Sequence, residues 1–122
     1  MLEKMKDKVN ANRALVHRGR WVTLAFILGI DKQDYLVAIN EGKIKSITPR
    51  LLATDTGQFN IRASQATWEE HWKSKPRRDY HDIWSMLPKN LIKIDGDLLP
   101  FMQNLQYFKD IIASLRSEKV TK

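Results

Sequence analysis

The sequence contains no cysteine among its 122 residues. This absence excludes disulfides, thiolate nucleophiles and zinc sites built from cysteine, and it fits a reducing compartment. Histidine is also scarce: only His17, His71 and His81 are present, and no two stand four residues apart as a helical metal pair would. The sequence therefore predicts neither a metal site nor a bound cofactor.

Long apolar runs are missing as well. The longest, Trp21 to Ile30, spans ten residues, about half of the ~20 that a membrane-spanning helix requires. The first twenty residues carry six basic side chains and lack the uncharged stretch of a secretory signal. We therefore expect a cytoplasmic protein that folds as one domain over residues 1–122.

What the sequence does contain is a change from helical to strand periodicity. Residues 1–19 place apolar side chains on one face and predict an N-terminal helix, interrupted on that face only by Asn12. Short stretches rich in β-formers follow, and the first three are joined by turn residues that predict an antiparallel meander. The expected strands are 21–28, 35–39, 43–48, 59–63 and 91–94.

Helix signals surround the last two of these strands. Ser64 is placed to cap a helix that begins at Gln65, and Asp79 to cap a second short helix that Pro88 ends. After Asp95 we expect Gly96 to take a positive φ and Asp97 to cap a C-terminal helix. Pro100 fits the first turn of that helix. Residues 117–122 are expected to fray.

The C-terminal helix carries more apolar surface than can face water. Its apolar residues recur at steps of three and four, which places them on one stripe. With the strands before it, this helix predicts an α+β fold in which helices cover one face of a five-stranded, mainly antiparallel sheet. The stripe consists of Leu98, Phe101, Leu105, Phe108, Ile112 and Leu115, widened by Met102 and Ile111.

The net charge of +7 is concentrated in two basic clusters, within residues 1–20 and within residues 73–78. Such clusters attract phosphate groups of lipids, nucleotide-bearing ligands or nucleic acid, although a solvated basic surface is the common alternative. Neither basic run contains an aromatic residue, which argues against nucleic-acid binding. The predicted contacts to an anionic membrane or to a ligand's phosphates are Lys73, Lys75, Arg77 and Arg78.

No combination of residues predicts catalysis. Ser64, Ser74 and Ser85 do not lie in a nucleophile-elbow context, and Gly96 is not part of a phosphate-binding glycine motif. The neighbouring acids at 69–70 and 95–97 are accounted for by a helix face and by capping. We therefore expect a protein that is not an enzyme.

Three strings, in this order, resemble the sterol-binding domain of the sterol carrier protein 2 family. They are the hairpin Tyr35–Ile44, the strand Phe59–Ser64 that leads through Thr67–Glu69 into a helix, and the strand-to-helix turn Leu91–Leu98. The resemblance covers about residues 21–115. It is that of a small stand-alone member of bacterial type.

The resemblance implies an apolar tunnel between the sheet and the C-terminal helices. It further implies non-catalytic binding and transfer of a lipid, whether a fatty acid, a fatty acyl-CoA or a sterol-like molecule. A protein-interaction module whose tunnel is filled by its own side chains is the main alternative, and the oligomeric state is left open. The predicted ligand-binding residues are Trp68, Trp72, Ile83, Trp84, Phe101, Met102, Leu105 and Phe108.

Overall fold

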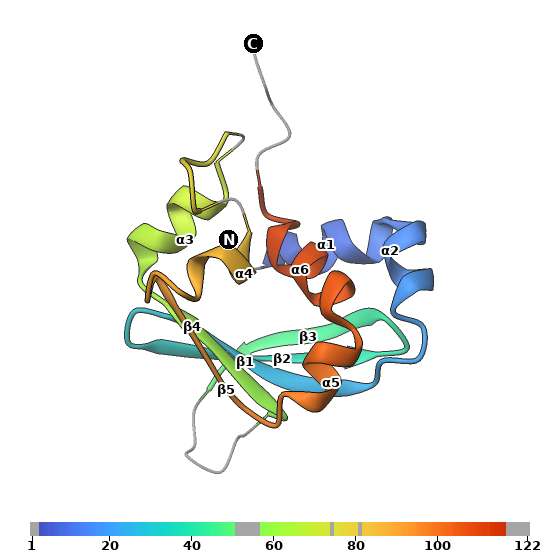
Figure 1. Ribbon diagram of the computed structural model, residues 1–122. Helices are drawn as coiled ribbons and strands as arrows, with labels where there is room; N and C mark the ends of the chain where they lie inside the picture. The colour runs from blue at the N-terminus through green and yellow to red at the C-terminus, as the bar shows by residue number, and fades with distance from the viewer. Residues whose placement is uncertain (1–2, 51–56, 74, 81, 117–122) are drawn as a thin grey trace.

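The structure is a computed structural model that describes residues 3–50, 57–73, 75–80 and 82–116. Its five strands form one sheet in the order β3-β2-β1-β4-β5, and the helices gather on one side of it (Figure 1). This arrangement confirms the predicted α+β fold. The strands are β1 (Leu24–Ile30), β2 (Gln33–Asn40), β3 (Lys43–Pro49), β4 (Phe59–Ala63) and β5 (Ile92–Gly96).

The predicted antiparallel meander is formed by the first three strands. β1 pairs with β2, and β2 with β3, both antiparallel. The hairpin between β2 and β3 turns at Glu41 and Gly42, whose φ angles of 51° and 85° are those of a tight primed turn. β4 returns parallel to β1, with Ile27 opposite Asn60, and β5 lies antiparallel to β4. Three of the four strand pairings are therefore antiparallel, as expected for a mainly antiparallel sheet.

The N-terminal segment is two helices, so the prediction of one helix over residues 1–19 was wrong. α1 spans Glu3–Ala11 and α2 spans Arg13–Arg18. Asn12 separates them because its backbone is extended and its side chain accepts a hydrogen bond from the Leu15 N–H at 3.1 Å. An asparagine at this place ends one helix and caps the next.

Of the two short helices before β5, the first has the predicted N-cap and the second does not. α3 spans Gln65–His71, and Ser64 caps it by accepting a hydrogen bond from the Thr67 N–H, as predicted. α4 spans only Ile83–Met86, and its cap is Asp82 instead of the predicted Asp79. Asp79 has a φ of 75°, which is incompatible with the extended backbone of an N-cap residue.

The C-terminal segment is also two helices where one was predicted. α5 spans Leu99–Gln103 and α6 spans Leu105–Ala113, with the break at Asn104. Gly96 has the predicted positive φ, at 99°, and Pro100 lies in the first turn. The N-cap position belongs to Leu98 instead of Asp97, although the Asp97 carboxylate still accepts a hydrogen bond from the Leu99 N–H at 3.2 Å.

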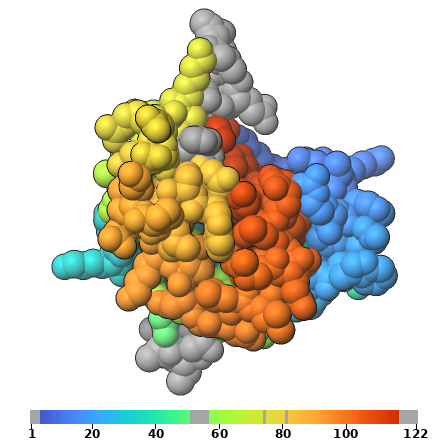
Figure 2. Space-filling model, viewed as in Figure 1, coloured from blue at the N-terminus to red at the C-terminus, as the bar shows by residue number. Residues whose placement is uncertain are grey.

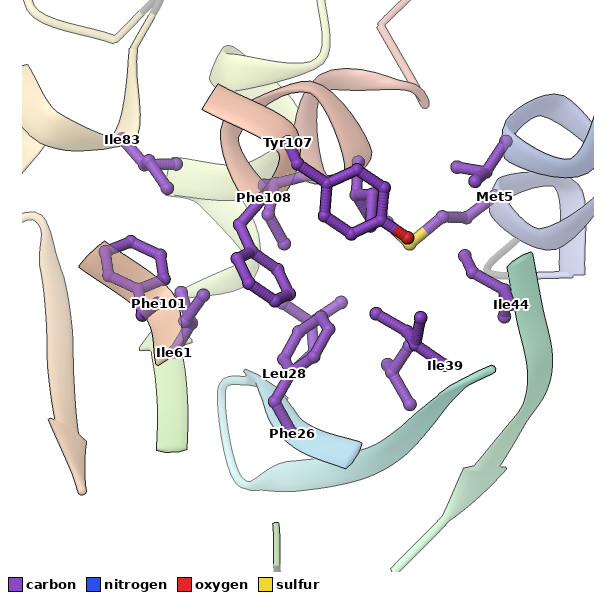
Figure 3. Packing of buried hydrophobic residues seen from close by; sticks show 14 of the residues in the cluster. Met5, Phe26, Leu28, Ile39, Ile44, Ile61, Ile83, Phe101, Tyr107 and Phe108 are labelled. Carbon is purple, nitrogen blue, oxygen red and sulfur yellow. The ribbon is translucent and has the colours of Figure 1, made fainter. Parts of the chain in front are cut away.

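Sheet and helices enclose one core of buried apolar side chains, and Figure 3 shows rings and aliphatic groups from both layers meeting there. Met5 and Val9 bring α1 into this core, and Ile44 brings in β3. In the part of the chain described here, no helix has the length and hydropathy needed to cross a bilayer.

The turn at Gly96 yields a test of the fold. A Cβ at this position would lie 2.8 Å from the Cα of Phe59, in addition to the unfavourable positive φ. Strained backbone alone costs about 1–3 kcal/mol, so we expect Gly96→Val to lower the free energy of unfolding in urea by at least that amount. Lys93→Val, an exposed position on the same strand, is the control and should change it by less than about 0.5 kcal/mol. Equal unfolding midpoints for the two variants would contradict the geometry of this turn.

Candidate functional site

Four phenylalanines join the sheet to the C-terminal helices. Phe26 of β1 and Phe59 of β4 stack face to face, with ring centroids 5.1 Å apart and planes 8° apart. Phe108 of α6 sets its ring edge against both, at 5.8 Å and 5.1 Å. Phe101 of α5 lies 5.3 Å from Phe59 and 5.9 Å from Phe108. All four rings are fully buried, and we refer to them as the aromatic cluster.

The aromatic cluster reaches the surface through Trp84. Its indole lies 6.4 Å from the ring of Phe101, in a stacked orientation, and is 40% exposed. Leu98, Leu99 and Met102, from the start and outer side of α5, are 36%, 64% and 47% exposed. We call these four residues the apolar patch. The α4 and α5 segments that carry it adjoin on the face shown in Figure 2.

Trp68 and Trp72 form a separate buried pair. Their rings stack at 5.4 Å on α3. The Trp68 Nε1–H donates to the Gly29 carbonyl and the Trp72 Nε1–H to the Ile112 carbonyl, each at 2.8 Å. These hydrogen bonds fasten α3 to β1 on one side and to α6 on the other. A buried indole with its N–H satisfied in this way is typical of a structural position.

The predicted ligand-binding residues thus fall into three groups. Phe101, Phe108 and Trp84 come together, while Trp68 and Trp72 form the separate buried pair on α3. Ile83 is buried and Leu105 half-buried in the same core, and Met102 is largely exposed. Ligand contact by these eight residues stays a prediction. The rings of the aromatic cluster touch one another, so the space between the sheet and α5 is occupied by protein.

Sequence analysis missed two members of the cluster, Phe26 and Phe59. Phe59 faces inward on a strand predicted from its alternation, and Phe26 lies buried on a strand predicted from its richness in β-formers. Their adjacency depends on the parallel pairing of β1 with β4, which places Phe59 beside Phe26. The local pattern of neither strand specifies that pairing, so the sequence offered only signals that each segment is a strand.

The four basic residues predicted to contact phosphates have different surroundings. The side chain of Glu70 is buried, and it forms ion pairs with Lys73 at 2.9 Å and with Arg77 at 3.4 Å. The Lys73 ammonium first, and then the Arg77 backbone N–H, hold the pKa of Glu70 below its ordinary value. Lys75 and Arg78 are exposed. Contact of these four residues with an anionic membrane or a ligand's phosphates stays a prediction.

Two further groups with a shifted pKa, Asp34 and Tyr107, have structural explanations. Hydrogen bonding to Arg62, with help from Arg50, lowers the pKa of the Asp34 carboxyl. Burial raises the pKa of Tyr107, whose hydroxyl donates to the Gly42 carbonyl at 2.7 Å. The described residues hold no group of three or more side chains suited to a metal ion.

Comparison with solved structures identifies the architecture. No protein-family model and no curated protein matches the sequence. A crystal structure of sterol carrier protein 2 superposes with a TM-score of 0.73 at 14% identity, covering 94% of this chain and 92% of that chain. The chain has the sterol carrier protein 2 fold.

Two further structures share this sterol carrier protein 2 fold. A possible sterol carrier protein from Thermus thermophilus matches with a TM-score of 0.63 at 16% identity, over 97% of this chain and 87% of its own. A structure named UbiJ-SCP2 ubiquinone synthesis protein gives 0.62 at 12% identity, over 96% of this chain and 89% of its own. At these identities the likeness establishes the fold.

The different depths of the tryptophans generate a prediction. Trp72 is buried and hydrogen-bonded, so Trp72→Ala should lower the free energy of unfolding by about 3–5 kcal/mol. Trp84 is 40% exposed, so Trp84→Ala should cost only roughly 1–2 kcal/mol. Urea unfolding of the two variants measures both values. A larger loss for Trp84→Ala would show that Trp84, and not Trp72, is the structural residue.

Proposed function

We propose that the protein binds the apolar chain of a lipid between the sheet and α5–α6, without changing it chemically. The observation that carries the proposal is the continuity between the buried aromatic cluster and the exposed apolar patch, through the contact of Phe101 with Trp84. Binding sites for small apolar molecules are lined mainly by aromatic and aliphatic side chains. Here such residues lead without interruption from the surface to the sheet.

The exposure of the apolar patch supports this role. Burying apolar surface contributes about 25 cal/mol of favourable free energy for each Å², and surface left in water does not gain it. Four large apolar side chains on two short adjacent helices therefore represent a surface that folding alone does not explain. Contiguous exposed patches of this kind mark sites for ligands, membranes or partner proteins.

Access to the interior would require α5 to move, because the aromatic rings fill the space beneath it. α5 suits that movement: it is five residues long, it follows the turn at Gly96, and Asn104 separates it from α6. Its start is held by the bond from the Leu99 N–H to Asp97 and by the bond from the Asp97 N–H to the Gln58 carbonyl. Few hydrogen bonds therefore oppose the movement, and its main cost is the loss of the contacts that Phe101 makes with Phe59 and Phe108.

The fold supports a lipid as the class of ligand. Fatty acids, fatty acyl-CoA and sterol-like molecules are the ligands that the resemblance implies. The match to a ubiquinone synthesis protein adds lipids with an isoprenoid chain. Transfer without catalysis accords with the chemistry of the site, in which apolar side chains face one another, and the acids Asp34 and Glu70, whose pKa values are lowered, belong to ion pairs elsewhere in the fold.

A second candidate is a protein-interaction module. The filled interior favours it, because a cluster whose rings pack against one another needs no ligand to complete it. In that case the apolar patch would bind a partner protein, and lipids would not bind with a fixed stoichiometry. The experiment below separates the two.

Binding is tested by titrating the protein with a fluorescent fatty acid and then displacing it with oleic acid, oleoyl-CoA, cholesterol and an isoprenoid quinone. We expect saturable binding of one fatty acid per chain and displacement by at least one of the four lipids. Leu99→Asp places a charge in the apolar patch and should weaken the affinity about tenfold, equivalent to about 1.4 kcal/mol.

The matched control is Ala66→Asp, which adds the same charge at an exposed position on α3. Its affinity and its Tm should equal those of the unaltered protein. Failure of the folded protein to bind any of these lipids would overturn the proposal and favour the interaction module. Equal weakening by both variants would show that the patch is not the route of access.

A further inference from the structure

A pocket of about 360 Å³ lies between α2, the end of α1 and the start of β3, away from the aromatic cluster. We call it the basic pocket, because four of its six lining residues are basic and none is acidic. Arg13 and His17 stand one helical turn apart on α2, so their side chains share a face. The lining residues are Asn10, Arg13, Val16, His17, Arg20 and Lys43.

The backbone around Lys43 is fixed on both sides. At Gly42 the hairpin packs so closely on α2 that an added Cβ would lie 2.4 Å from the Val16 carbonyl oxygen. The Gly42 carbonyl accepts the Tyr107 hydroxyl, and the Asn10 side chain exchanges two hydrogen bonds with the Ile44 backbone, at 2.8 and 3.0 Å. The backbone of Lys43 is therefore held at a defined position beside α2.

Arg20 is positioned on the other side of the pocket. Its guanidinium donates a hydrogen bond to the His17 carbonyl at 2.7 Å and lies 5.3 Å from the centre of the Trp21 ring. Trp21 itself is 84% exposed, although it is among the largest apolar side chains of the protein. A rigid, amphipathic ring thus projects into solvent next to the basic pocket.

Several basic side chains elsewhere in the protein form ion pairs with carboxylates, and those of the basic pocket do not in the part of the chain that the structure describes. Arg18, one residue along from His17, pairs with Asp110, and Lys73 pairs with Glu70. Within residues 3–50, 57–73, 75–80 and 82–116, no carboxylate pairs with Arg13, Arg20 or Lys43. Cations brought together without a counter-charge repel one another, so an anion bound among them would relieve that repulsion.

We propose that the basic pocket binds a phosphate group. Guanidinium groups donate paired hydrogen bonds to phosphate oxygens, and an ammonium adds a compact charge. The phosphate is that of a lipid headgroup or of a soluble phosphate, because both present the same oxygens, and the exposed Trp21 would suit the first by lying at a membrane surface. This inference is independent of lipid-chain binding near α5, since the two sites share no residue.

The test compares two double variants of the full chain. Arg13→Gln with Lys43→Gln removes two charges from the basic pocket, and Lys32→Gln with Lys89→Gln removes two from exposed positions outside it. All four side chains are exposed, so circular dichroism should show both proteins folded. Inorganic phosphate is titrated against ¹⁵N-labelled protein at constant ionic strength, and NMR follows the backbone amide shifts. Binding to vesicles of phosphatidylcholine, alone or with added phosphatidic acid, is measured by sedimentation.

We expect phosphate to give saturable shifts at the backbone amides of Arg13, His17, Arg20 and Lys43. The pocket variant should lose at least tenfold in affinity for phosphate, and the control variant should not. Preference for phosphatidic acid vesicles, with competition by inorganic phosphate, would identify a lipid headgroup. Saturation by phosphate without that preference would identify a soluble ligand. Equal losses in both double variants, or shifts that do not saturate, would overturn the proposal.

Discussion

Contact between the stacked rings of Phe26 and Phe59 and the edge of Phe108 is the constraint on which the remaining structure depends. Phe26 and Phe59 come from β1 and β4, the one parallel pair of the sheet, and Phe108 comes from α6. Each aromatic pair contributes about 0.5–1.5 kcal/mol beyond its burial. The cluster therefore fixes the central strand pairing and the position of the C-terminal helices together, and Phe101 adds α5 to the same set of contacts.

The same packing also determines what a lipid would have to displace in order to bind. Rings that hold the helix layer on the sheet also fill the space beneath α5, so a ligand has to exchange contacts with them. The exposed patch around Trp84, the turn at Gly96 and the break at Asn104 all lie at or beside α5, which carries Phe101 of the cluster. In the proposed binding, β1, β4 and α6 would keep their contacts while α5 moves.

Sequence patterns predicted the order of elements well and the depth of side chains poorly. The alternation at Phe59–Ala63 and the turn residues Glu41 and Gly42 specify local geometry, so β4 and the hairpin were predicted correctly, whereas β1 begins at Leu24 instead of the predicted Trp21. Asn12 occupies one position of an apolar stripe that resumes beyond it, and Asn104 lies beside a stripe that continues past it, so periodicity alone did not show that the helices divide at these residues. Periodicity also assigns a residue to a face without showing how far it is covered, which is why Met102 and Trp84 proved more exposed than Phe101 and Trp72. The pairing of Phe26 with Phe59 and the convergence of Arg13 with Lys43 depend on tertiary contacts across distant parts of the chain.

The central claim, that an apolar chain is held between the sheet and α5–α6, is tested most directly by native mass spectrometry of the purified protein, before and after incubation with a lipid mixture. The account predicts a species carrying one lipid per chain, whose lipid is released intact on denaturation and is identified by extraction. A spectrum that shows only the bare chain, both as purified and after incubation with fatty acid, fatty acyl-CoA, sterol and isoprenoid lipids, would contradict it.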